Sequence, residues 1–206
     1  MFDLYVVTDS ASSGMREAEI ARLAYKGGAD VVQLRMKGAS ARDMLDQARE
    51  MKSISDEFTG LFIVNDRVDI AMLADADGVH LGQSDIPLAE ARKLLGDDRL
   101  IGISVHSVEE ARIAEDGGAD YISVGSIFAT STKPDAIQQI GLDMVFMISQ
   151  EVDMPLVAIG GINLGNIPET MRAGADCVAV ASAIFKGDVI SNIREMRTLS
   201  IRSRLE

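Results

Sequence analysis

The sequence predicts an α/β protein, a single domain over residues 1–206 folded as a (β/α)8 barrel. Eight short apolar segments alternate with segments of helical periodicity along the whole chain, which is typical of this barrel. A Gly-rich phrase recurs before several of the apolar segments. Neither a Pro-rich linker nor a low-complexity stretch interrupts the alternation, so we expect one domain.

The recurring phrase marks the junction between a helix and the following strand. It reads KGGADVVQLR at 26–35, DADGVHLG at 75–82, DGGADYISVG at 116–125 and RAGADCVAVA at 172–181. A glycine can end a helix in the left-handed conformation, and the apolar run after it suits a strand covered on both faces. The acidic residue precedes the strand, away from the end where such barrels build their sites. We therefore interpret four of these acids as loop or capping residues: Asp30, Asp77, Asp120 and Asp176.

We expect strands at 4–8, 31–36, 61–65, 78–81, 100–105, 121–127, 156–162 and 177–183, and helices that include 40–59, 88–95, 108–114 and 142–152. Parallel neighbours need crossovers, and eight right-handed crossovers can close a sheet. The main competitor is an open doubly wound sheet. Such a sheet usually carries a Gly-rich fingerprint after its first strand, which VVTDSASSG does not resemble.

Composition excludes several classes of function. The chain is 47% hydrophobic and 25% charged, which is ordinary for a globular protein. A formal net charge of −12 disfavours nucleic acid and anionic membranes as partners, but a local group of cations can still bind a small phosphorylated ligand. The sequence shows no membrane-length apolar run and no signal-peptide pattern, so we expect a cytoplasmic protein. The single Cys177 is expected to be a buried core thiol.

The second strand carries a candidate site in QLRMK, residues 33–37. Alternation along a strand sends Gln33, Arg35 and Lys37 to one side and Leu34 and Met36 to the other. In a barrel the inward side at the carboxyl end of a strand is the active site. The fork of donors on arginine and the point charge on lysine both suit a diphosphate.

Two carboxylates follow the third and fourth strands. Asp66 comes directly after Asn65, and Asp85 lies in HLGQSD just beyond the fourth strand. Mg²⁺ is often bound by one or two carboxylates and completes its shell with phosphate oxygens and water. The alternative is that Asp66 and Asp85 are helix N-caps. His80, inside the fourth strand, could equally be a core histidine.

The later strands supply groups suited to a second anion site. GISVHS places Ser104 and His106 at the fifth strand, and GSIFATSTK brings hydroxyls and Lys133 over the barrel mouth. AIGGI follows the seventh strand and AVASAI the eighth, where many such barrels bind phosphate through backbone N–H groups. We therefore expect two anion sites, one with a metal and one without.

Together these segments resemble the thiamine phosphate synthase family. The resemblance runs in order through LYVVTD, QLRMK, IVNDRVDIA, ADGVHLGQSD, GISVHS, SIFATSTKPDA, VAIGGI and ADCVAVASAIF, to about Phe185. It implies a transferase that joins a pyrimidine methyl diphosphate to a thiazole phosphate, using Mg²⁺ and releasing pyrophosphate. It further implies that the diphosphate departs first, leaving a carbocation that the thiazole nitrogen captures.

The resemblance also implies roles for individual residues. The pyrimidine diphosphate would be held by Gln33, Arg35, Lys37, Asn65, Ser104 and Lys133, within a substrate-binding segment that includes Leu34 and Met36. The thiazole phosphate would be held by Thr130, Ser131, Thr132, Gly161, Ala181 and Ser182. Asp66 and Asp85 would bind Mg²⁺, and the catalytic groups would be Arg35, Lys37, Ser104 and Lys133.

The chain departs from the family pattern at three positions. QLRMK has Met36 where the family has an acid, and the strand-six loop has Ser126 and Ala129 where the family has prolines. Met36 should face away from the substrate by alternation. Without the prolines we expect a looser loop.

Three rival functions remain open from the sequence. A thiazole tautomerase would share the barrel, and His106 favours it. A non-catalytic barrel would bind thiazole phosphate without turnover. A sugar-phosphate isomerase or epimerase would need an acid and base pair at the strand ends. The sequence is also compatible with a homo-oligomer, and segment 190–206 could pack on the barrel or on a neighbouring subunit.

Overall fold

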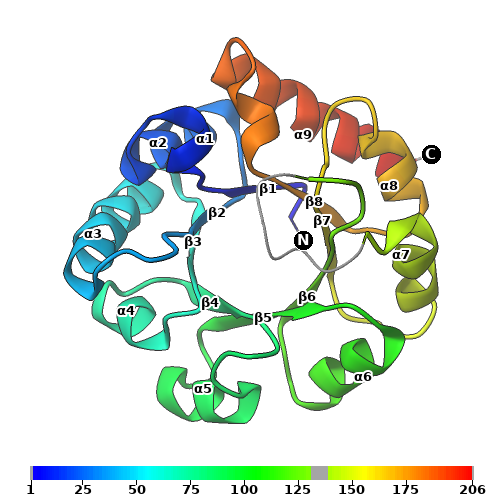
Figure 1. Ribbon diagram of the computed structural model, residues 1–206, viewed down its shortest axis with the longest axis horizontal. Helices are drawn as coiled ribbons and strands as arrows, with labels where there is room; N and C mark the ends of the chain where they lie inside the picture. The colour runs from blue at the N-terminus through cyan, green and yellow to red at the C-terminus, as the bar shows by residue number, and fades with distance from the viewer. Residues whose placement is uncertain (1, 131–138, 206) are drawn as a thin grey trace.

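The computed structural model describes residues 2–130 and 139–205, and in these residues eight parallel strands close into a barrel inside a ring of helices (Figure 1). Each strand pairs with the next along the chain, and β1 pairs with β8. The strands are β1 Leu4–Val7, β2 Val31–Leu34, β3 Leu61–Asn65, β4 Gly78–Leu81, β5 Leu100–Val105, β6 Tyr121–Val124, β7 Leu156–Ile159 and β8 Cys177–Val180. The predicted (β/α)8 barrel is confirmed, and the open-sheet alternative is wrong.

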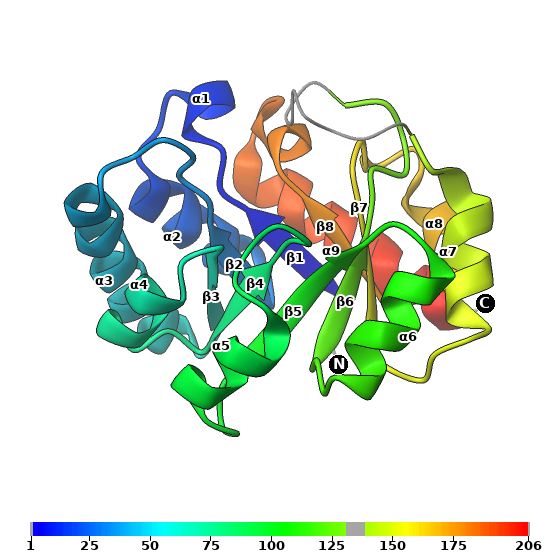
Figure 2. The same cartoon turned by 60° about the horizontal axis from the view of Figure 1, so that its bottom comes forward.

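The helices follow the strands in the order expected of a barrel. Most begin at the carboxyl end of the preceding strand and pack outside the sheet, as the side view shows (Figure 2). They are α1 Ser10–Ser13, α2 Glu17–Gly27, α3 Ala41–Phe58, α4 Val68–Leu73, α5 Leu88–Leu95, α6 Val108–Asp116, α7 Gly141–Ser149, α8 Ile167–Arg172, η1 Ser182–Phe185 and α9 Val189–Leu205. Among the described residues, no helix combines the length and apolarity needed to span a membrane.

Five strands end one to three residues earlier than the sequence predicted: β1, β2, β6, β7 and β8. At β2 the sheet ladder stops because the Arg35 N–H donates to the Thr8 side chain (3.1 Å), not to a strand carbonyl. The residues after these strand ends form the rim of a cavity. Arg35 and Gly160, predicted inside strands, both line it from loops.

Alternation along each strand produces two cores. Outward residues such as Leu4 and Val6 join the helices in the larger core. Inward residues, including Tyr5, Tyr121 and Cys177, fill the barrel below its mouth. Cys177 is 2% exposed, and burial raises the pKa of its thiol, so the expectation of a core thiol is confirmed.

The four recurring aspartates satisfy backbone donors at the amino end of the barrel. Each stands before an even-numbered strand and accepts a hydrogen bond from a backbone N–H at the start of the preceding strand. The donors are the N–H groups of Leu4, Phe62, Ile101 and Leu156, at 2.7–3.0 Å from Asp30, Asp77, Asp120 and Asp176. Their predicted structural role is thus confirmed, and the repeated phrase encodes a repeated hydrogen bond.

Helix α9 packs against the same barrel, on α2, α8 and β1. Arg197 pairs with Asp3 and Asp30, and Arg204 pairs with Asp3 (2.9–3.1 Å). Among the alternatives left open for segment 190–206, the described residues of this helix therefore pack on their own barrel.

We predict that Asp77→Ala lowers the free energy of unfolding by about 1–3 kcal/mol, because the Phe62 N–H and Lys52 both lose a charged acceptor. Urea unfolding measures the change. Asp98→Ala, in an exposed loop, is the control and should change stability by no more than about 0.5 kcal/mol. Equal stability of the two variants would contradict the capping role of Asp77.

Candidate functional site

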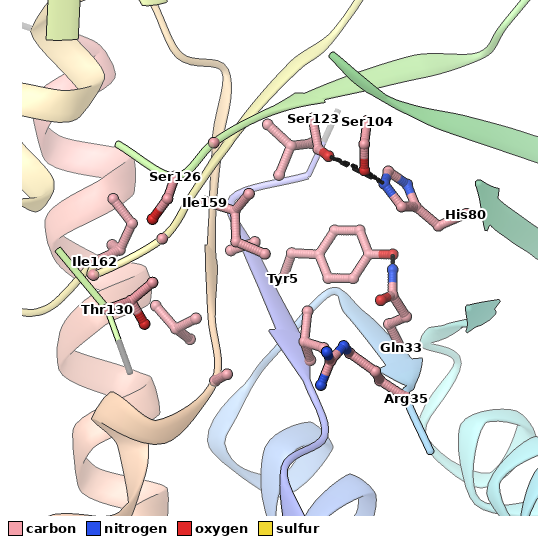
Figure 3. Close-up of a pocket in the computed structure, with 18 of the residues that line it drawn as sticks. Tyr5, Gln33, Arg35, His80, Ser104, Ser123, Ser126, Thr130, Ile159 and Ile162 are labelled. Carbon is pink, nitrogen blue, oxygen red and sulfur yellow. Dashed lines mark hydrogen bonds between the residues drawn. The ribbon is translucent and has the colours of Figure 1, made fainter. Parts of the chain in front are cut away.

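A cavity of about 300 Å³ opens at the carboxyl end of the barrel strands (Figure 3). Residues of all eight strands line it, among them Asn65 of β3 and His80 of β4. This is the end at which (β/α)8 barrels build their sites. The candidate site therefore lies where the sequence placed it.

The floor of the cavity is polar on the side formed by β2, β4, β5 and β6. Gln33, His80, Ser104 and Ser123 line it, and Gln33 and His80 are almost fully buried. Gln33 and Ser104 were predicted from the sequence, whereas Tyr5 and Ser123 were missed. Both missed residues stand at inward positions of predicted strands, so alternation alone could have identified them.

Arg35 provides a cation beside this floor. Its side chain lines the cavity, and its Nε is buried with no hydrogen-bond partner among the described residues. A buried donor without a partner is costly, which suits a site whose partner is an anionic ligand. The predicted anion-binding role of Arg35 fits this geometry.

Lys37, Asp66 and Asp85 form a charged cluster beside Asn65 and Gly82, which line the cavity. The Lys37 Nζ lies 2.5 Å from Asp66 Oδ2, and Asp66 lies near enough to Asp85 to raise the pKa of its carboxyl group. Lys37 itself is largely exposed, so it approaches from the rim. Arg35 lines the cavity, whereas Lys37, Asp66 and Asp85 adjoin it through Asn65 and Gly82. The expected joining of Arg35, Asp66 and Asp85 with Lys133 in a single pocket stays a prediction, because Lys133 falls outside the described residues.

The local backbone aims the two carboxylates. Asp66 has φ of 62°, a left-handed conformation uncommon for a residue other than glycine, and its N–H donates to the His80 carbonyl at 2.9 Å. Asp85 accepts from the Gly82 N–H at 2.6 Å. The N-cap alternative is wrong for both, since α4 and α5 are preceded by Arg67 and Pro87 at their cap positions.

The electrostatics of the pair suit a divalent cation. Burial raises the pKa of the Asp85 carboxyl, the Gly82 N–H opposes that shift, and the neighbouring Asp66 adds to it. A cation between the carboxylates would offset both costs. Within the described residues no group of three acidic, His or Cys side chains could hold a metal. Two carboxylates are nevertheless enough for Mg²⁺ when a diphosphate supplies further oxygens.

The other side of the cavity carries the groups predicted for a second phosphate. Thr130, Gly161, Ala181 and Ser182 all line it. Gly160 and Gly161 have φ of 103° and 67°, and a Cβ on Gly161 would lie 2.7 Å from the Ala129 carbonyl oxygen. The glycine pair therefore serves close packing against the strand-six loop as well as access to the cavity. The predictions for Ser131, Thr132 and Lys133 fall outside the described residues.

The strand-six loop keeps backbone hydrogen bonds as far as it is described. The N–H groups of Ile127 and Phe128 donate to Ile159 and Gly160 at 3.0 Å. Ser126, at a position where the family has proline, donates from its hydroxyl to the Phe128 carbonyl at 2.8 Å. The expected loosening stays a prediction for residues 131–138.

Two members of the predicted substrate-binding set need correction. Leu34 is fully buried in the core between strands and helices, and Met36 lines a separate groove with Glu17 and Asp43. Their side chains point away from the cavity because side chains alternate along β2 and its extension. Including them as substrate contacts was wrong for their side chains, whereas the expectation that Met36 faces away is confirmed.

His106 lines the cavity and is held by Glu110 of α6. Its Nδ1 lies 3.1 Å from Glu110 Oε2, and the same oxygen accepts from the His106 backbone N–H at 2.7 Å. A carboxylate on Nδ1 orients the imidazole and leaves Nε2 as its second polar atom. An oriented histidine of this kind can move a proton.

Comparison with known proteins points to one family. The family model described as thiamine monophosphate synthase matches residues 4–184. Thiamine-phosphate synthase of Chloroflexus aurantiacus is 50% identical over 198 residues, covering 95% of this chain and 91% of the relative. That of Clostridium novyi is 46% identical over 190 residues, covering 92% and 93%.

Solved structures agree with the sequence relatives. Thiamine phosphate pyrophosphorylase from Pyrococcus furiosus superposes with a TM-score of 0.89 at 40% identity, covering 97% of this chain and 96% of the other. A 3-hexulose-6-phosphate synthase superposes with a TM-score of 0.70 at 18% identity, covering 97% and 99%. At that identity the second match supports the barrel fold alone.

We predict that Arg35→Ala weakens binding of inorganic pyrophosphate about tenfold to a hundredfold in the presence of Mg²⁺, because a charged donor is lost from the cavity. Isothermal titration calorimetry measures the affinity. Arg42→Ala, on the exposed face of α3, is the matched control and should bind as the wild type does. Unchanged affinity in Arg35→Ala would remove Arg35 from the anion site.

Proposed function

The chain belongs to the thiamine monophosphate synthase family, and from that premise we propose that it condenses 4-amino-2-methyl-5-(diphosphooxymethyl)pyrimidine with 4-methyl-5-(2-phosphoethyl)thiazole, the carboxylated thiazole phosphate being a further candidate substrate. The products are thiamine phosphate and pyrophosphate, so the chain is a transferase of the alkyl and aryl class. The observation that carries the proposal is a cavity lined by Arg35 with the Lys37, Asp66 and Asp85 cluster beside it, next to Asn65 and Gly82. That set brings cations close to two carboxylates that would hold Mg²⁺, a combination suited to a diphosphate leaving group.

The bond changes are a substitution in two steps. The C–O bond between the pyrimidine methylene and the diphosphate breaks, and its electron pair leaves with the diphosphate oxygen. The thiazole nitrogen then donates its lone pair to the methylene carbon. No covalent bond to the protein forms in either step, so the chain's task is to hold two anions and stabilise the departing charge.

The described residues divide this task between them. Arg35 and Lys37 would neutralise the negative charge that accumulates on the leaving diphosphate; Arg35 lines the cavity, and Lys37 pairs with Asp66 beside it. Asp66 and Asp85 would hold Mg²⁺, which when bound supplies a divalent positive charge to the leaving oxygens. Gln33, Asn65 and Ser104 face the same space and can hydrogen-bond the pyrimidine diphosphate.

The thiazole phosphate is assigned to the opposite side of the cavity. Thr130, Gly161, Ala181 and Ser182 line that side and combine hydroxyls with backbone at the ends of β7 and β8. Ser131, Thr132 and Lys133 complete the proposal from the sequence. Cytoplasmic location and assembly into a homo-oligomer stay predictions.

Thiazole tautomerase activity is the second candidate, because His106 is oriented by Glu110 and lines the cavity. That reaction moves protons and has no diphosphate to release, so it needs neither Mg²⁺ nor the Lys37, Asp66 and Asp85 cluster. Metal dependence therefore separates the two activities. A non-catalytic binding barrel would show no turnover with either substrate set.

We predict that the protein, mixed with both phosphorylated substrates and Mg²⁺, forms thiamine phosphate and one equivalent of pyrophosphate, and that a chelator stops the reaction. Chromatography of thiamine phosphate with a coupled pyrophosphate assay measures both products. Turnover that persists with the chelator, or binding without products, would reject the proposed metal-assisted coupling.

We predict that Asp85→Asn lowers kcat/KM at limiting Mg²⁺ by about a hundredfold, since the amide oxygen can still accept from the Gly82 N–H while the negative charge is lost. Steady-state kinetics across Mg²⁺ concentrations measure the change, and excess Mg²⁺ should recover part of the rate. Asp97→Asn, in the exposed α5–β5 loop, is the control. A rate equal to wild type would place Asp85 outside the metal site.

A further inference from the structure

We infer that a chain of buried hydrogen bonds beneath the cavity couples two groups of its floor, so that one presents an acceptor and the other a donor toward the pyrimidine ring. The hydrogen-bond chain runs from Gln33 to Ser104 through Tyr5, Tyr121 and His80. Figure 3 shows its two ends, Gln33 with Tyr5 and His80 with Ser104. This inference rests on the proposed function, because it concerns how that site selects its pyrimidine. Tyr121 does not line the cavity and so acts through other residues, as a positioning residue.

Strand register explains why these side chains meet inside the barrel. His80, Gly102 and Tyr121 are direct partners across β4, β5 and β6. A Cβ on Gly102 would lie 2.1 Å from the Tyr121 ring and 2.5 Å from His80 Nδ1. Gly102 therefore leaves the space in which the two rings stack, with centroids 5.5 Å apart.

The direction of the chain follows from its first link. Gln33 Nε2 can only donate, and it lies 2.7 Å from the Tyr5 hydroxyl. The Tyr5 oxygen accepts that bond, so its own proton is directed to the Tyr121 oxygen at 3.1 Å. Burial raises the pKa of both tyrosines, so each hydroxyl keeps its one proton to pass on.

The second half of the chain sets the tautomer of His80. Tyr121 directs its proton to His80 Nδ1 at 3.1 Å, which requires Nδ1 to be unprotonated. The neutral ring then carries its hydrogen on Nε2, which lies 2.9 Å from Ser104 Oγ and 3.1 Å from Ser123 Oγ. The Ser104 oxygen accepts that hydrogen, so the Ser104 proton turns either to the cavity or to the Ser123 oxygen at 3.4 Å.

The two ends of the chain therefore present opposite groups to the cavity that both line. Gln33 offers its carbonyl oxygen as an acceptor, and Ser104 offers its hydroxyl as a donor. Turning the Gln33 amide would reverse every link and exchange the two roles, so the ends stay complementary. An aminopyrimidine has the matching pattern, because its exocyclic amine donates and its ring nitrogens accept, whereas the oxo analogue inverts it.

Removing one hydroxyl in the middle of the hydrogen-bond chain tests the coupling between Gln33 and Ser104. In Tyr121→Phe the ring remains and the hydroxyl is lost, so Gln33 and Ser104 can each reorient alone. We expect the preference for the aminopyrimidine diphosphate over its 4-oxo analogue to fall about tenfold or more, in both calorimetric affinity and kcat/KM. Tyr5→Phe breaks the adjacent links, and it should act in the same direction if Tyr121→Phe does not fold.

Tyr25→Phe is the matched control. Tyr25 is also a buried tyrosine, but its hydroxyl donates to the Leu61 carbonyl outside the barrel at 2.7 Å. It should lose stability without changing the preference between the two pyrimidines. An equal change in control and test variants, or an unchanged preference in Tyr121→Phe and Tyr5→Phe, would overturn the coupling.

Calorimetry separates failure of this inference from failure of the proposed function. A protein that binds the two pyrimidine diphosphates selectively, loses that selectivity in Tyr121→Phe and forms no thiamine phosphate would keep the inference and reject the coupling reaction. A protein that binds neither compound would reject both.

Nitrogen-15 NMR of the histidines reports the direction of the hydrogen-bond chain without substrate. The protein has two histidines, so His106→Asn assigns the signals of both rings. We expect His80 in the Nε2–H form in the wild type and a mixture of tautomers in Tyr121→Phe. A wild-type Nδ1–H form would overturn the direction, and a tautomer unaffected by Tyr121→Phe would overturn the link through Tyr121.

Discussion

The structure depends on a difference between the two ends of one closed sheet: the amino end holds stabilising contacts, and the carboxyl end holds the candidate site. At the amino end, four aspartates accept hydrogen bonds from the first N–H groups of neighbouring strands, and cations from the helices pair with three of them. Buried strand ends need such partners, because an unpaired donor in a barrel costs as much as a lost hydrogen bond. Because these local charges satisfy the donors at the amino end, the acids and cations at the carboxyl end are not needed to hold the strands together.

Asp66 and Asp85 can therefore lie near each other at the carboxyl end without a role in closing the barrel. Neither caps a helix, Asp66 has a left-handed backbone, and the charge of Asp66 raises the pKa of the Asp85 carboxyl group. Two adjoining carboxylates at a partly buried rim repel one another, and Lys37 neutralises only one side of the pair. An arrangement that costs stability without helping the fold is typical of a ligand site.

Much of this was predictable because the chain repeats its junctions. The phrase before each even-numbered strand gave the strand positions, and alternation separated Gln33 and Arg35 from Leu34 and Met36. Alternation did not locate where strands end, since the Thr8 side chain ends the ladder at Arg35 through a contact distant in sequence. The role of Tyr121, which does not line the cavity, was missed for a related reason. An aromatic residue on a buried strand looks like core until the partner across the barrel is known.

The cavity is asymmetric in the polarity of the residues that line it. Along β1, β7 and β8 its wall is apolar, formed by side chains such as Val7, Val157 and Ala179. Along β2, β4, β5 and β6 its floor is polar and cross-linked by hydrogen bonds. A ring with several hydrogen-bonding atoms gains more on the polar side, whereas a thiazole ring loses little on the apolar side, next to the glycines and hydroxyls suited to its phosphate. Under the proposed function this division would bring the two reacting rings side by side, with the leaving diphosphate toward Arg35 and the acid pair.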